Sequence, residues 1–160
     1  MTKPPTPTAH EANLSYAAQL LLGAVRISRT AATKDIGEIG IPFYLLIGFA
    51  IENGLKGFLK HRQDARGNWR KSHDLSLLLS HCRENGLRVN EAVDRLIHLI
   101  SRYRAEFWFR HPEKAGTADV FDAHSTIFLT DALLRQAFEQ TNTSWRHWPK
   151  MPPPQSPSEE

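Results

Sequence analysis

The stretch "FYLLIGFAIENGLKGFLKHRQ", residues 43–63, decides the fold of this chain. Its apolar residues cover most of the circumference of an α-helix instead of forming one stripe. A helix of this kind is surrounded by other elements on most of its sides. Pro42 directly precedes the stretch and suits the first turn of a helix, where a residue needs no N–H partner. The stretch therefore predicts a helix at the centre of a helical bundle.

The segments on either side also repeat their apolar residues with a period of 3.6, and none alternates with a period of two. A first helix is expected from Thr8, where Glu11 completes a capping box, and it fades near Thr33. Residues 34–42 are expected to form a loop because they contain two glycines and a proline. The segment 64–71 is also expected to be a loop.

Three more helices are expected after that second loop. The third has Ser72 as its cap and ends at Gly86, and the fourth has Asn90 as its cap and stops at Pro112. A fifth helix runs through residues 125–140. The sequence predicts an all-α protein, an antiparallel bundle of four or five helices.

The length of 160 residues favours one domain, which we place at residues 9–148. Residues 1–8 and 149–160 are rich in proline, serine and threonine and are expected to be disordered tails. The net charge of +3 permits an anionic partner without requiring one. No apolar run approaches the roughly 20 residues that span a bilayer, and the first residues lack the apolar core of a signal peptide. We expect a cytoplasmic protein without membrane contact.

Cys82 is the single cysteine, so an internal disulfide and a cysteine-rich zinc module are both excluded. The histidines His61, His81 and His98 do not combine with Cys82 in a metal-ligand spacing. We expect neither a bound metal nor a cofactor.

Glu52 and Lys56 lie four residues apart, so they are neighbours on one side of the central helix. They form either a surface pair worth about 0.3–0.5 kcal/mol or a buried polar anchor in which Glu52 reaches a cation on another helix. His73 and Asp74 open the third helix. They are either a structural histidine with a capping acid, or a catalytic base with its neighbour.

The stretch "SRYRAEFWFRHPE", residues 101–113, places Arg104 and His111 seven residues apart. One continuous helix would separate them by about 10 Å, but a helix that ends near Phe109 lets His111 fold back toward Arg104. The pair would then suit a phosphodiester, because a guanidinium holds a phosphate and an imidazole moves protons near neutral pH. The alternative is structural, with Arg104 and Arg110 paired to Glu52 or Asp74 between helices.

The basic segment 61–71 places four cations around one tryptophan, Trp69: Arg62, Arg66, Arg70 and Lys71. Charge and stacking together could hold single-stranded RNA there. The alternative is a solvated loop without a ligand.

Three motifs occur in a fixed order: "IENGLKGFL", "HDLSLLL" and "RYRAEFWFRHPE". In this order they resemble the HEPN superfamily (higher eukaryotes and prokaryotes nucleotide-binding domain), over residues 16–138. The resemblance implies a small helical bundle that forms a homodimer and handles RNA or a nucleotide. Many members are metal-independent endoribonucleases of toxin–antitoxin, phage-defence or CRISPR systems.

For this chain the resemblance implies Arg104 and His111 as the catalytic pair, supported by a polar centre of Glu52, Lys56, His73, Asp74 and Arg110. Ala105 stands where active members often carry Asn, Asp or His. Other members bind nucleotides without cleavage or act with a nucleotidyltransferase partner, and their Arg-Tyr-Pro signature also matches "FRHPE". An RNA nuclease with an antitoxin and a non-catalytic binding module therefore both remain open. A dimerisation domain that uses the aromatic residues 107–109 is a third hypothesis.

Overall fold

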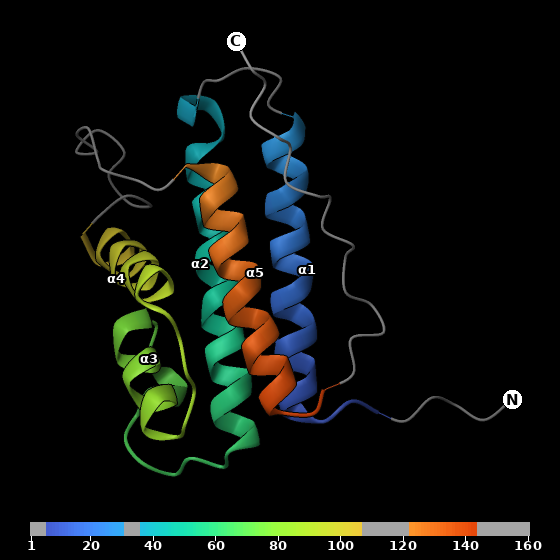
Figure 1. The fold of residues 1–160 in the computed structure, drawn as a ribbon, viewed down its shortest axis with the longest axis vertical. Helices are drawn as coiled ribbons and strands as arrows, with labels where there is room; N and C mark the ends of the chain where they lie inside the picture. Colours follow the sequence, from blue (N-terminus) through green and yellow to red (C-terminus); the bar gives the residue numbers. More distant parts are fainter. Residues whose placement is uncertain (1–5, 31–35, 107–121, 144–160) are drawn as a thin grey trace, which may run out of the picture.

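The computed structural model describes residues 6–30, 36–106 and 122–143. These residues form five α-helices (Figure 1): α1 Ala9–Thr30, α2 Ile36–His61, α3 Leu75–Glu84, α4 Glu91–Glu106 and α5 Ala123–Gln140. A short 3-10 helix, η1, spans Trp69–Lys71 between α2 and α3. The described residues contain no β-strand, so the predicted all-α class is confirmed.

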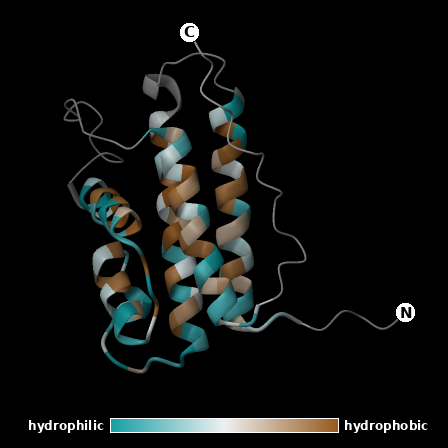
Figure 2. Ribbon diagram, in the orientation of Figure 1, coloured by the Kyte–Doolittle hydropathy of each residue, from teal (hydrophilic) through white to brown (hydrophobic). Residues whose placement is uncertain are grey.

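The helix α2 is the central element, as the sequence predicted. It packs against α1, α3, α4 and α5. Fully buried apolar side chains follow one another along it, among them Phe43, Ile47, Ile51, Leu55 and Phe58. Hydrophobic residues colour long parts of α2, whereas the loop between α2 and α3 is hydrophilic (Figure 2).

The helices are not all antiparallel, which corrects the predicted bundle. Gly57 of α2 lies beside Leu14 of α1 and Gly23 lies beside Leu46, so α1 and α2 are antiparallel. Gly54 of α2 lies beside Leu134 of α5, and both helices run in the same direction (Figure 1). The helices α3 and α4 lie between α2 and α5 in the chain, and this connection lets α5 begin near the end of the bundle where α2 begins.

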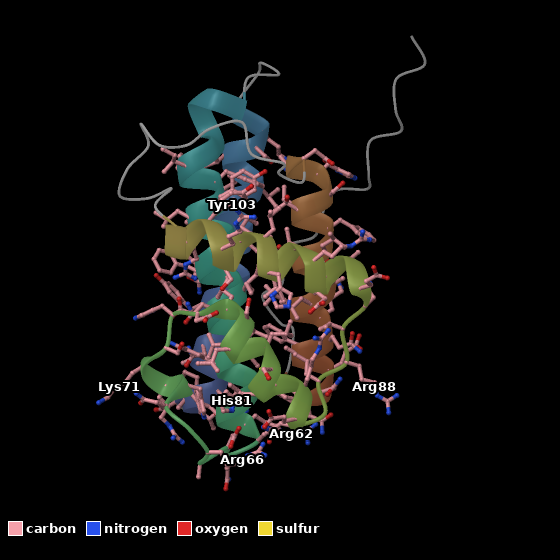
Figure 3. The ribbon with its side chains drawn as sticks, turned by 90° about the vertical axis from the view of Figure 1, so that its left-hand side faces the viewer. Arg62, Arg66, Lys71, His81, Arg88 and Tyr103 are labelled. Carbon is pink, nitrogen blue, oxygen red and sulfur yellow. The ribbon has the colours of Figure 1, made fainter. Side chains whose placement is uncertain are left out.

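The helices α3 and α4 form an antiparallel pair joined by a row of polar contacts. Ser101 Oγ donates to Asp74 Oδ1 at 2.9 Å, and Ser76 Oγ lies 2.8 Å from His98 Nδ1. Helix α4 runs across the long axis of α2 and α5 (Figure 3). This crossing brings the end of α4 against the middle of α2.

Two of the predicted helix starts are confirmed. At α1, the backbone N–H of Thr8 donates to Glu11 Oε2 at 2.7 Å, and the backbone N–H of Glu11 donates to Thr8 Oγ1 at 3.5 Å. At α4, the backbone N–H of Val93 donates to Asn90 Oδ1 at 2.8 Å. Both arrangements satisfy N–H groups that have no partner inside the helix.

Two other predicted starts are wrong. The N-cap of α3 is Asp74 rather than Ser72, because its carboxylate accepts from the backbone N–H groups of Ser76 and Leu77. Helix α2 begins at Ile36, so Pro42 lies inside it rather than at its start. Pro42 removes one backbone hydrogen bond, and the extensive burial of the turns that follow compensates for that loss.

No helix in the described part of the chain combines the length and the apolar character that crossing a membrane requires.

Candidate functional site

Three polar side chains surround one buried carboxylate, that of Glu52 in α2. Its Oε1 accepts from Lys56 Nζ at 2.8 Å and lies 2.9 Å from His73 Nδ1. Its Oε2 accepts from Arg104 Nη2, on α4, at 2.7 Å. We call Glu52, Lys56, His73 and Arg104 the Glu52 cluster. The buried-anchor hypothesis for Glu52 and its pairing with Arg104 are confirmed.

The sequence builds this cluster through the helical repeat of α2. Gly48 lies one turn before Glu52, and its carbonyl oxygen accepts from Arg104 Nη1 at 3.0 Å. A Cβ atom at Gly48 would lie 3.1 Å from Arg104 Cδ, so glycine leaves the room that the arginine occupies. The guanidinium carbon also lies 5.1 Å from the centre of the Phe49 ring, a distance typical of a cation–π contact.

The electrostatics of the cluster keep Glu52 ionised. Burial acts to raise the pKa of Glu52, but hydrogen bonds from Lys56 and Arg104, together with their charges, outweigh it and lower the pKa below its usual value. One carboxylate therefore faces two permanent cations. Lys56 and Arg104 together carry one positive charge more than the carboxylate neutralises.

Arg104 is fixed by hydrogen bonds and is largely shielded from solvent. Its side chain is only 12% exposed, and each of its two Nη atoms donates to an acceptor on α2. Its predicted catalytic partner His111 and the supporting Arg110 lie outside the described residues. The described geometry thus supports the structural interpretation of Arg104 and leaves the Arg104–His111 pair as a hypothesis.

Asp74 does not join the Glu52 cluster, which corrects its place in the predicted polar centre. Burial acts to raise the pKa of Asp74, but hydrogen bonds from Ser101, Leu77 and Ser76 lower it. Its carboxylate caps α3 and ties that helix to α4. The neighbouring His73 does belong to the Glu52 cluster. It contacts Glu52 while 73% of its side chain remains exposed.

Trp69 does not lie on the surface, so the prediction that it stacks on RNA is wrong. Its side chain is fully buried, and its indole N–H donates to the carbonyl oxygen of Asp64 at 3.0 Å. Arg70 covers the indole at 4.7 Å and donates to the same carbonyl oxygen. The short turn of η1 directs the indole inward, because burying so large a ring stabilises the fold. Arg66 and Lys71 point outward from this loop (Figure 3).

The loop between α2 and η1 is organised by Asp64, a residue that the sequence analysis missed. Its carboxylate accepts from the backbone N–H of Arg66 at 2.9 Å and from Asn85 Nδ2 at 2.8 Å. The side chain of Arg66 also donates to it at 3.1 Å. The backbone N–H of Arg66 donates to the side chain of Asp64 two residues earlier, which is an Asx turn, and Gly67 follows at φ +66°. An aspartate three residues before a glycine in a loop is the sequence signal that could have identified Asp64.

We expect Asp64→Asn to reduce the acid sensitivity of the fold. The hydrogen bonds from Arg66, the backbone one foremost, and from Asn85 lower the pKa of Asp64 from 3.8 to about 2. The carboxylate therefore stabilises the folded state above about pH 4, and this contribution is lost as the pH falls toward 2. Urea midpoints measured from pH 7 to pH 2 should fall less steeply below pH 4 in the variant than in the wild type. The exposed Glu139→Gln is the control, and equal slopes for all three proteins would contradict the role of Asp64.

The described residues contain no group of three or more side chains suited to hold a metal ion. Cys82 is buried, and burial raises the pKa of its thiol far above the usual range. Its Sγ donates to the carbonyl oxygen of Leu55 at 3.5 Å. Cys82 is thus a core residue and not a reactive thiol.

Comparisons with family models, with curated proteins and with solved structures found no match to this chain. The HEPN resemblance therefore rests on the three sequence motifs alone.

Proposed function

We propose that this protein is a HEPN-like module that binds the phosphate groups of RNA or of a nucleotide without cleaving them. The observation that supports binding is the charge of the Glu52 cluster. Lys56 and Arg104 share one carboxylate, and His73 adds an exposed imidazole with a second ring nitrogen for hydrogen bonding. A phosphate oxygen beside this cluster would meet the excess positive charge that the described residues leave.

The exposed cations near the cluster extend the same surface. Lys71 ends η1 two residues before His73, and its side chain points away from the body of the protein (Figure 3). A ligand that reaches His73 therefore also comes within range of Lys71.

The geometry of Arg104 favours binding over cleavage. A guanidinium that stabilises a transition state must reach the charge that develops on the phosphate. Arg104 is instead engaged by Gly48 and Glu52 and is almost fully covered. Releasing it would leave Glu52 buried with one partner fewer, which is energetically unfavourable.

The same resemblance suggests the partners of such a module. A second copy of this chain and either an antitoxin or a nucleotidyltransferase are the partners that we propose, and each follows from the family pattern.

Binding can be tested by calorimetric titration with inorganic triphosphate and with a short single-stranded RNA. We expect His73→Ala and Lys71→Gln each to weaken binding by up to about tenfold, because the first removes an exposed imidazole and the second a charged hydrogen-bond donor. Arg88→Gln, an exposed cation on the opposite side in Figure 3, should leave binding unchanged. Equal affinities for all four proteins would place the ligand elsewhere and refute this site.

Cleavage is tested separately, by incubating RNA in EDTA with the wild type and with a folded His111→Ala variant. The proposal expects intact RNA in both samples. Cleavage by the wild type that disappears in the variant would overturn it and establish Arg104 and His111 as a metal-free nuclease site.

A further inference from the structure

A continuous row of uncharged and basic groups crosses the outer side of α1 and α2. Lys60 Nζ donates to Asn13 Oδ1 at 2.6 Å, and Asn13 Nδ2 donates to Asn53 Oδ1 at 2.9 Å. Asn53 Nδ2 in turn donates to the carbonyl oxygen of Phe49 at 2.9 Å. Tyr16 lies three residues after Asn13, one turn along the same side of α1. We call Asn13, Tyr16, Phe49, Asn53 and Lys60 the Phe49 strip.

Two aromatic rings of the strip remain open to solvent. Phe49 is 37% exposed and Tyr16 is 53% exposed. The ring of Phe49 is not loose, because the Arg104 guanidinium lies 5.1 Å from its centre. An aromatic ring that is already held in place loses little conformational entropy when a second flat group stacks on it.

The polar groups of the strip keep hydrogen-bonding capacity. Each amide oxygen has two lone pairs and each amide nitrogen has two N–H groups, and the contacts above use only part of this capacity at Asn13 and Asn53. The Lys60 ammonium has three N–H donors and uses one of them for Asn13. The strip thus offers stacking, amide groups and a cation side by side.

The charge of this side is also one-sided. On α1 and α2, two acids have described side chains, and both are engaged. Glu11 accepts two hydrogen bonds from Thr8, and Glu52 is buried in its cluster. Lys60 is an exposed cation near the end of α2, whereas Lys56 is bound to Glu52 and nearly covered. A polyanion would therefore meet the exposed ammonium of Lys60, while Thr8 holds the Glu11 carboxylate at the start of α1.

We propose that the Phe49 strip binds single-stranded RNA, with bases stacked on Phe49 and Tyr16 and the backbone phosphates directed to Lys60. Aromatic platforms beside cations are the recurrent means of holding single strands. Phe49 and Lys60 are separated by about 16 Å along α2. That distance accommodates several stacked nucleotides, which repeat about every 3.4 Å along a strand.

The inference rests on the proposed function, because it takes the phosphate-binding Glu52 cluster as one end of the same path. Arg104 joins the two, since it contacts Glu52 on one side and the Phe49 ring on the other. The strip nevertheless adds a demand that a phosphate site alone does not make, namely a base to stack.

The test is fluorescence anisotropy with labelled single strands of about 12 nucleotides, within the range of ~4–16 nucleotides that small single-strand domains occupy. RNA, DNA of the same sequence, an RNA duplex and inorganic triphosphate are compared as ligands. The variants are Phe49→Leu, Phe49→Tyr, Tyr16→Leu and Lys60→Gln. The matched controls are Phe128→Leu, an exposed phenyl group on α5, and Arg88→Gln, and circular dichroism verifies that each variant is folded.

We expect Phe49→Leu to weaken binding of single-stranded RNA by about tenfold, Tyr16→Leu to weaken it by a smaller factor, and Phe49→Tyr to restore it. Lys60→Gln should lower the slope of affinity against salt by about 0.7. The two controls should bind like the wild type, and the duplex should bind poorly because its bases are already stacked. Equal binding of RNA and DNA would keep the strip as a single-strand site but overturn its assignment to RNA.

Failure of the strip and failure of the proposed function give different results. Unchanged RNA affinity in Phe49→Leu, Tyr16→Leu and Lys60→Gln, with triphosphate binding still sensitive to His73→Ala, would overturn the strip alone. RNA binding that depends on Phe49 but not on His73 or Lys71 would support the strip and refute the phosphate site. A wild type that binds none of the four ligands would overturn both.

Discussion

Replacing Glu52 with alanine should lower the free energy of unfolding by about 3 kcal/mol. Removing one partner of a buried ion pair costs roughly 3–5 kcal/mol, and the slight exposure of Lys56 and Arg104 places this site at the lower end. The variant leaves the Arg104 guanidinium and the Lys56 ammonium nearly covered and without their carboxylate. The measurement is the urea denaturation midpoint, followed by circular dichroism.

Two further variants separate the charge of Glu52 from its packing. Glu139→Ala removes an exposed acid from α5 and should change the midpoint little. The double variant Glu52→Ala with Arg104→Met should be less destabilised than the sum of the two single variants, because no buried guanidinium is left unpaired. A midpoint that does not change in Glu52→Ala would remove Glu52 as the anchor between α2 and α4.

The second large effect is expected from Trp69→Ala, with a loss of about 3–5 kcal/mol, as for other large-to-small replacements of buried aromatic rings. Trp69 is fully buried, and its indole N–H donates a hydrogen bond to the carbonyl oxygen of Asp64. The variant opens a cavity beneath η1 and also releases the loop that Asp64 organises. Chemical denaturation measures the loss.

Trp69→Phe is the matched variant, because it keeps an aromatic ring but not the N–H donor. We expect it to lose only part of the stability, of which the missing hydrogen bond accounts for about 1 kcal/mol. If Trp69→Ala kept wild-type stability but no longer bound RNA, the indole would have to act at the surface, as the sequence first suggested.

Much of the fold could be predicted from the sequence because local signals and burial agree there. The stretch that begins at Phe43 is apolar over most of its circumference and identifies the central helix, and Thr8 and Asn90 cap their helices as their side chains allow. The pairing of Glu52 with a cation from another helix was one of the two interpretations that the sequence left open. A carboxylate on an apolar face is stable only if an opposite charge reaches it.

The remaining features depend on tertiary contacts that no local pattern encodes. Trp69 lies in a basic segment whose composition is typical of a solvent-exposed loop. Its ring is nevertheless buried beneath η1, and this burial depends on the helices packed around it. Ser72 and Asp74 are both good caps, and Ser101 of α4 decides between them by donating to Asp74. Pro42 predicts the first turn of a helix, but residues 36–41 before it are also helical.

The parallel placement of α5 on α2 determines the order in which the core is completed. The helices α1 and α2 are adjacent in the chain, so their contacts form early and at little entropic cost. The side of this hairpin that receives Leu134 stays open until α5 returns from beyond the α3–α4 pair. An apolar surface that waits for a distant segment is the stage at which a folding chain aggregates most readily. We therefore expect the docking of α5 to be the late step that closes the core.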